Sequence, residues 1–272
     1  MAQQDAEECW SQIISTLRTT VKSRTTNKSF VDTYMSGSLT TTLTCDDNPD
    51  EPATTSSDTF LKLDCHIGIT TNFMRDGILA GLTEKLEKRS EVLGRDATWT
   101  KTSRVTRLPK YLVVHFVRFY WKRDTNKKAK ILRKVKFPLE LDATEFCTDE
   151  VRTKTVPVRD AVREIRKKAE EKERARKRAR IQTEVESTNG AGAVAEQGGE
   201  KMEVDEVDVE KLIDEGMRND VGSNPTGLYE LAGVLTHAGS NADSGHWQGW
   251  TKQEQGGKIT AFPKPKLRAR LF

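Results

Sequence analysis

The chain has 272 residues, 35% of them apolar, and its 45 basic and 41 acidic side chains give a formal net charge of +4. This length is enough for one or two hydrophobic cores, and so small a net charge does not by itself indicate a nucleic-acid partner. The mean hydropathy is -0.67, and no apolar run approaches the roughly 20 residues of a membrane span. Because the N-terminus also lacks the plan of a signal peptide, we expect a soluble protein with no membrane partner that is not secreted.

The first half of the chain predicts two helices and two strands. Apolar side chains recur every three or four residues over residues 5–22, which is typical of one face of a helix. Residues 39–45 and 61–69 alternate apolar and polar side chains, as half-buried strands do. We expect these strands to pair antiparallel across a polar loop at 46–58, and a shorter helix to follow over 76–91.

A nearly continuous apolar run at 111–121 predicts the central strand of a sheet. A polar turn at 124–128 follows this run, and a further strand is expected over 131–139. The sequence therefore predicts that these two strands form the heart of the hydrophobic core.

A charged insert, residues 152–225, lacks the means to build a core of its own. No aromatic residue occurs between Phe146 and Tyr229, so we expect the insert to be mobile or a solvated helix. Residues 159–180 are strongly basic and residues 200–215 strongly acidic. The basic run fits either a nucleic-acid or nuclear-import patch or a solvated helix balanced by its acidic neighbour. We favour the second, because no aromatic side chain is interleaved to stack on bases.

The last part of the chain returns to a sheet pattern at 228–235. A loop rich in glycine and serine, 238–245, then leads to His246 and Trp247. Residues 253–272 show no periodicity, and we expect them to form a tail.

His246 is the candidate general base. Gly245 allows another chain to approach the backbone closely, and an imidazole next to a flexible loop can face a cleft, although the residues alone leave open whether this histidine is functional. His237 and His115 are expected to be packed polar groups on strands, and His66 is expected to be exposed.

The four cysteines offer no activated nucleophile. They are far apart and form no C-x-x-C pair, so the sequence predicts neither a disulfide framework nor a metal site, and a reducing compartment is expected: the cytoplasm, with the nucleus as an alternative. Cys9 falls on the apolar stripe of the first helix, and Cys45 and Cys65 share the inward phase of their strands. Cys147 lies among acidic residues, which would raise the pKa of its thiol.

Several motifs occur in a fixed order along the chain. They are Gln3-Gln4-Asp5-Ala6-x-Glu8, Leu108-Pro109-x-x-Leu112 ending in Arg118-Phe119, Val135-Lys136-Phe137-Pro138-Leu139, Tyr229-x-Leu231-x-x-Val234-x-x-His237-x-Gly239, and Ser244-Gly245-His246. These motifs resemble the later boxes of the ubiquitin-specific protease family, a family of papain-like thiol hydrolases, and most of all its proteasome-associated branch. The resemblance covers roughly residues 2–151 and 226–252.

The resemblance implies an incomplete α+β papain-like fold. Residues 1–151 would form part of the protease domain, with a thumb helix, fingers and palm. Residues 152–225 would be the insert, 226–252 the rest of the palm with the histidine box, and 253–272 an atypical tail.

The same resemblance assigns site residues and partners. His246 matches the general base of the family, and no cofactor or metal is implied, since Cys45 and Cys65 stand singly where relatives carry pairs. Ubiquitin and its conjugates would be the partners, with the proteasome as a further candidate and nucleic acid not favoured. The channel for the ubiquitin tail would be lined by Gln3, Gln4, Asp5, Gly245 and Trp247.

Two departures from the family pattern bear on activity. The family's nucleophile lies in a G-N-T-C-[YF]-[ML]-N box upstream of Q-Q-D, and this chain contains no Asn-Thr-Cys. The family's orienting Asp or Asn follows the histidine, and residues 253–272 contain neither. We therefore expect the chain to belong to a family of thiol-dependent ubiquitin hydrolases, but to be inactive by itself. The alternative is a catalytically dead ubiquitin-binding or scaffold protein.

Overall fold

The structure of the chain is a computed structural model that describes residues 6–24, 27–124, 126–188, 208–239, 245–251, 253–255 and 258–260. Helices and small sheets, antiparallel except for one parallel pair, surround one main core and one smaller apolar cluster. No helix in these described ranges is long and apolar enough to cross a membrane. Gln3, Gln4 and Asp5 lie outside the described residues.

The first helix, α1 (Ala6–Thr20), forms where the sequence predicts it, and it buries Ile14. The prediction for Cys9 is wrong, because its side chain is exposed to solvent. A short helix, α2 (Phe30–Tyr34), follows, and the hydroxyl of Ser29 caps it by accepting a hydrogen bond from the Val31 amide at 3.1 Å. Such a cap satisfies one of the free donors at a helix start.

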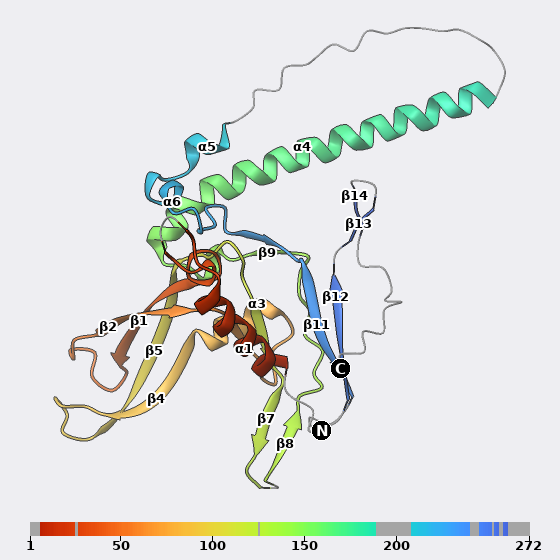
Figure 1. Cartoon of the computed structure of the whole chain (residues 1–272). Coiled ribbons are helices and arrows are strands. Elements are labelled where there is room, and N and C mark those ends of the chain that lie inside the picture. The colour runs from red at the N-terminus through yellow and green to blue at the C-terminus, as the bar shows by residue number, and fades with distance from the viewer. Residues whose placement is uncertain are drawn as a thin grey trace.

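A four-stranded antiparallel sheet forms the part that projects on one side in Figure 1. Its strand order is β2-β1-β5-β4. The strands are β1 (Gly37–Cys45), β2 (Thr54–Phe60), β4 (Thr83–Arg89) and β5 (Asp96–Arg107).

Two predictions in this region are wrong. The partner of β1 is β2, which begins inside the predicted loop 46–58, and not the run 61–69. All but the last residue of β2 are exposed, so this edge strand lacks the alternation that marks a half-buried one. The predicted helix 76–91 ends early, because α3 (Met74–Gly81) gives way to the charged edge strand β4.

Gly81, the last residue of α3, lies very close to β3. A β-carbon at this position would lie 2.8 Å from the carbonyl oxygen of Asp64 and 2.7 Å from the His66 ring. Only glycine permits α3 to pack so closely on β3 (Leu63–His66).

The apolar run at 111–121 is not the centre of a large sheet, contrary to the prediction. It divides between β6 (Val114–Val117), which pairs in parallel with β3, and β7 (Phe119–Lys122), which pairs with β8 (Lys127–Lys130). No strand forms at 131–139 beyond an isolated bridge. Arg118 supplies a reason, since its guanidinium donates to the carbonyls of Ile131 and Arg133 at 3.1 and 2.9 Å and so occupies backbone acceptors that a strand would pair.

The main core lies between α3, β5 and the segment that leads into the long helix. It includes the short strand β9 (Glu140–Asp142), which pairs antiparallel with β10 (Leu228–Glu230), and the 3₁₀ turn η1 (Thr144–Phe146). Its buried members are Phe60, Leu63, Cys65, Met74, Ile78, Leu82, Val105, Leu108, Leu141, Ala143, Phe146, Cys147 and Val151.

The described part of the charged insert consists mainly of one long helix, α4 (Asp149–Thr188), which extends away from the rest of the protein in Figure 1. The helical alternative is thus correct, but the first turns are part of the packed structure and not a solvated arm. Thr155 and Val158 have no exposed surface. Two short helices, α5 (Val209–Leu212) and α6 (Glu215–Asn219), bring the chain back toward the base of α4.

Three arginines of the basic run, at the base of α4, bind acids other than the ones we predicted, although Lys154, which precedes that run, lies 3.8 Å from Asp214 of the acidic run. Arg159 and Arg163 contact Asp142 at 3.1 and 3.2 Å, and Arg166 joins Glu140 to Glu230. These acids belong to β9 and β10, whereas the predicted acidic partner, residues 200–215, lies partly outside the described residues.

A hairpin of β11 (Gly233–Ala238) and β12 (His246–Thr251) follows β10 in the chain. The tail prediction is wrong over its first residues, because β13 (Gln253–Gln255) and β14 (Lys258–Thr260) form a further antiparallel pair. Strands of three residues are too short to show a periodic pattern in the sequence.

Candidate functional site

His246 is the first residue of β12, where it pairs with Ala238 across the hairpin. Its side chain is exposed, so the imidazole is available to solvent and to a bound chain. The same register sets His237 opposite Trp247. The hairpin therefore brings both histidines of this region to one end, next to the loop that joins the strands.

Any residue other than glycine at position 245 would strain the backbone. Its φ is +149°, and a β-carbon would lie 2.2 Å from the carbonyl oxygen of Ala238 and 2.6 Å from Nε2 of His237. The glycine before His246 thus serves to let β12 start against the end of β11.

Trp247 is partly buried in an aromatic cluster with Phe119 and His237. The ring of His237 lies 4.9 Å from that of Trp247 and 5.5 Å from that of Phe119, between ring centroids. On the other side of the hairpin, Nε1 of Trp250 donates to the hydroxyl of Thr236 at 2.9 Å. The aromatic side chains hold β12 in place, and the predicted role of Trp247 in the tail channel stays a prediction.

Lys130, at the end of β8, is a site residue that sequence reasoning missed. Its ammonium contacts Nδ1 and the backbone oxygen of His237 at 3.0 and 2.9 Å, and the carbonyl oxygen of Gly239 at 2.6 Å. No sequence signal distinguishes Lys130 from the neighbouring lysines.

The other histidines behave as predicted. His115 on β6 is half-buried and bonds through Nδ1 to Asp64 at 2.8 Å. The hydrogen bond from His115, aided by the charge of Lys62, lowers the pKa of the Asp64 carboxyl against the opposing effect of burial. His66 is exposed.

Three of the four cysteines are buried and poorly suited to be nucleophiles. Burial raises the pKa of the Cys65 thiol to about 11 and that of Cys147 to about 12. The sequence predicted a raised pKa for Cys147 from flanking acids, but its main cause is burial, with Asp142 adding to it. A thiol that stays protonated at neutral pH does not attack a carbonyl, so neither Cys65 nor Cys147 suits the reaction.

Within the described ranges there is no group of three or more side chains that could hold a metal ion. Cys45 and Cys65 belong to different clusters, one in the outer sheet and one in the main core. The predicted meeting of all five channel residues stays a prediction, because Gln3, Gln4 and Asp5 lie outside the described part of the chain.

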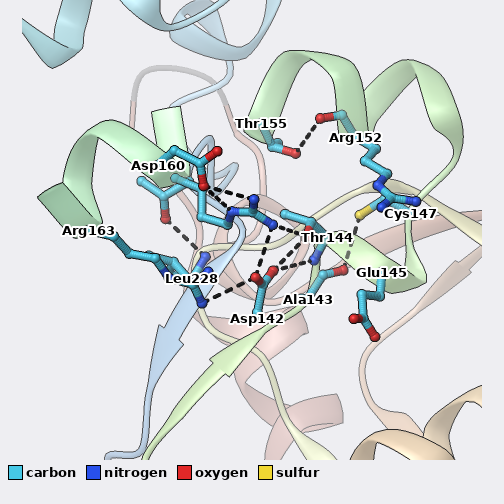
Figure 2. Close-up of polar contacts among 12 residues, drawn as sticks. Asp142, Ala143, Thr144, Glu145, Cys147, Arg152, Thr155, Asp160, Arg163 and Leu228 are labelled. Atoms are coloured by element: carbon cyan, nitrogen blue, oxygen red, sulfur yellow. Dashed lines mark hydrogen bonds and ion pairs between the residues drawn. The ribbon is translucent and has the colours of Figure 1, made fainter. Parts of the chain in front are cut away.

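A polar network anchors the strand that leads into the histidine hairpin. Asp142 accepts hydrogen bonds from the amide and hydroxyl of Thr144 at 3.1 and 2.6 Å and forms an ion pair with Arg163 of α4 (Figure 2). Arg159, also on α4, donates a hydrogen bond to the same carboxylate at 3.1 Å. Asp142 lies directly opposite Leu228 on β10. The network therefore ties the base of α4 to the strand pair from which β11 continues.

Asp142→Asn is expected to lower the free energy of unfolding by about 1–3 kcal/mol at pH 7. Burial acts to raise the pKa of Asp142, but the Thr144 hydrogen bonds and the two arginine charges outweigh it, and the pKa is lowered. The ionised Asp142 therefore stabilises the fold at every pH above the ordinary pKa of an aspartate. This contribution is lost as the pH falls from that ordinary pKa through the lower pKa of the folded state.

Urea unfolding at pH 7 and near pH 3 measures the effect of Asp142→Asn. The two proteins should differ at neutral pH and converge in acid. Asp58→Asn, on the exposed strand β2, is the control and should change little at either pH. An equal loss for Asp142→Asn at both values would contradict the electrostatic explanation.

The sequence profile of the ubiquitin carboxyl-terminal hydrolase family matches residues 1–264. Ubiquitin carboxyl-terminal hydrolase 6 of Schizosaccharomyces pombe is 50% identical over 252 residues, which are 92% of this chain and 51% of the relative. The proteins of Arabidopsis thaliana (hydrolase 6) and Caenorhabditis elegans (hydrolase 14) are 40% and 31% identical, and the matches cover 93% and 96% of this chain and 51% and 48% of those relatives. The chain spans about half the length of these relatives.

The fold has solved counterparts. The SAGA Ubp8/Sgf11/Sus1/Sgf73 DUB module bound to ubiquitin aldehyde matches 94% of this chain and 43% of its own chain, with a TM-score of 0.54 and 17% identity. A second structure of that module, bound to monoubiquitin, matches 94% of this chain and 42% of its own, with a TM-score of 0.55 and 18% identity. At such identity the likeness supports the α+β fold predicted from the sequence. With the profile match over nearly the whole chain, the conclusion is that this chain belongs to the ubiquitin carboxyl-terminal hydrolase family.

Proposed function

We propose that this chain carries the general base and the ubiquitin-binding surfaces of a thiol-dependent deubiquitinase, with His246 as the base. The observation that carries the proposal is the exposed imidazole of His246 at the start of β12, next to a glycine at which the backbone of β12 meets β11. The names of its relatives and the ubiquitin bound in the structural counterparts support ubiquitin conjugates as the substrate class.

The role of His246 follows from acid–base chemistry. Its neutral imidazole would take the proton of the nucleophilic thiol, and the thiolate would add to the carbonyl at the ubiquitin C-terminus. The imidazolium would then protonate the leaving amine as the C–N bond breaks. A water molecule, deprotonated by the same imidazole, would cleave the thioester and release both ubiquitin and the thiol.

We further propose that this polypeptide is inactive by itself and that the nucleophile belongs to a box upstream of Gln3. The buried thiols support this, because two of them have strongly raised pKa values, and Cys45 is also buried. The same observation favours the second candidate function, a ubiquitin-binding or scaffold protein without catalysis. Proteasome association and a location in the cytoplasm, with the nucleus as the alternative, are part of the proposal.

Ubiquitin with a C-terminal electrophile tests these proposals. We expect the chain to bind ¹⁵N-labelled ubiquitin in an NMR titration, but none of its cysteines to react with the electrophilic ubiquitin. Free iodoacetamide is the control, and it should modify Cys9, the exposed thiol, far faster than Cys45, Cys65 or Cys147.

Each result separates the candidates. Binding without labelling supports an inactive part of a deubiquitinase or a scaffold, and the activity of a completed enzyme then decides between them. Labelling that requires ubiquitin would show a working nucleophile in this chain, against the proposed inactivity. No binding at all would contradict both candidate functions.

A further inference from the structure

The ammonium of Lys130 is surrounded by three acceptors from the end of β11 and the residue after it. They are Nδ1 of His237 at 3.0 Å, the backbone oxygen of His237 at 2.9 Å and that of Gly239 at 2.6 Å. A lysine ammonium has three N–H donors and no acceptor. The three contacts therefore match its full donor capacity, and they join β8 to the end of β11, which is remote in sequence.

These contacts specify the chemical state of His237. Because Lys130 can only donate, Nδ1 of His237 must accept, and the ring then carries its proton on Nε2. A fully protonated ring would put two cations 3.0 Å apart, which is unfavourable. Among the described residues, Lys130 is the charged group in contact with this ring, and the charge of Arg118 acts in turn on Lys130. The fold thus keeps His237 neutral and in one tautomer.

The orientation of the His237 ring is linked to the position of His246. The ring is held between Phe119 and Trp247. Its Nε2 edge faces Gly245, since a β-carbon on that glycine would lie 2.6 Å from Nε2. A rotation of the ring would therefore displace the backbone of the residue directly before His246.

We propose that Lys130 is a positioning residue for the histidine hairpin: it fixes His237 as a neutral, Nε2-protonated ring and, through Gly245, sets the place from which His246 projects. The inference rests on the proposed function of His246 and adds to it how that side chain is held. Burial, together with the charge of Arg118, lowers the pKa of Lys130, which fits an ammonium that has exchanged water for protein acceptors.

Histidine NMR tests the proposal on the chain as it exists. The chain has four histidines, so selective ¹⁵N,¹³C labelling gives four ring systems that single substitutions assign. At pH 7 the His237 ring should be neutral with its proton on Nε2. In Lys130→Met the single tautomer should be lost and the His246 signals should shift, whereas Lys130→Arg, which still donates to Nδ1, should keep the tautomer.

The controls make the outcome decisive. Lys134→Met removes an exposed lysine a few residues away and should change neither ring. His66 and His115 report on folding, and the tautomer of the unchanged protein is measured without any substitution, so the proposal is testable even if Lys130→Met does not fold. A proton on Nδ1 of His237 in the unchanged protein would overturn it, as would unaltered His237 and His246 signals in folded Lys130→Met.

Ubiquitin added to the same samples separates this inference from the function on which it rests. Ubiquitin binding by the unchanged protein, by Lys130→Met and by Lys134→Met alike, together with an altered His237 tautomer in Lys130→Met alone, would support both, because Lys130 acts on the place of His246 and not on the ubiquitin-binding surface. If the unchanged protein shows the Nε2 tautomer but binds no ubiquitin, the contact of Lys130 stands and the proposed function is overturned, and with it the role of Lys130 toward a catalytic base.

Discussion

His246→Ala should abolish deubiquitination in a completed enzyme. The test protein is a chimera that carries the family's nucleophile box upstream of Gln3 and a strand with the orienting Asp in place of residues 253–272. Hydrolysis of a fluorogenic ubiquitin amide should fall by about 10³–10⁶-fold, because losses of this order follow removal of the histidine in other nucleophile–base pairs. Ubiquitin binding should change little, since the imidazole is exposed at the edge of the hairpin.

Two other histidines make the result specific. His66→Ala alters an exposed ring on β3 and should keep the rate of the chimera. His237→Ala should reduce the rate less than His246→Ala if its ring acts through position alone. A chimera that loses its rate with His237→Ala but keeps it with His246→Ala would show that the base is the other histidine.

Phe146→Ala should have the largest effect on stability. Its side chain has no exposed surface and lies in the main core, where η1 leads into α4. Truncating a buried phenylalanine costs about 3–5 kcal/mol through lost burial and the cavity that remains. This is a large part of the roughly 5–15 kcal/mol that holds an ordinary domain folded, so the urea midpoint should fall sharply.

Phe73→Ala is the matched control. Phe73 precedes α3 and is 52% exposed, so its truncation should cost under about 1 kcal/mol. Similar losses for the two variants, measured by urea unfolding with unchanged slopes, would show that the region around Phe146 is not part of the cooperative core.

Local patterns predicted the elements that bury one regular face. The helix α1, the strand β1 and the return to strands after Leu228 all follow from local sequence patterns, whereas the pairing of β11 with β12 was not predicted. The family resemblance, confirmed by the profile match, rested on short motifs. Their order along the chain can be read from the sequence without knowledge of the fold. His246 was identified in this way, and the structure places it on an exposed strand end.

What the sequence could not predict depends on contacts between distant segments. The strand β2 has almost no apolar side chain, and β4 is a charged edge, so both owe their conformation to pairing with β1 and β5. Lys130 gains its role only because β8 meets the end of β11. Cys9 shows the opposite kind of error. It lies on the apolar stripe of α1 and was expected to be buried, but no distant segment among the described residues covers it and its side chain is exposed.

The late return of β10 has a consequence for synthesis on the ribosome. Leu228 is buried against the strand of Asp142, and the Tyr229 hydroxyl donates to the carbonyl of Pro109 at 2.5 Å. Roughly 85 residues separate Asp142 from Leu228, which takes on the order of 4–17 s to translate at about 5–20 residues per second. During that interval β9 is a strand edge without its partner β10, which has not yet been synthesised. Early formation of the α4 helix would cover the face of the core next to β9 until β10 arrives.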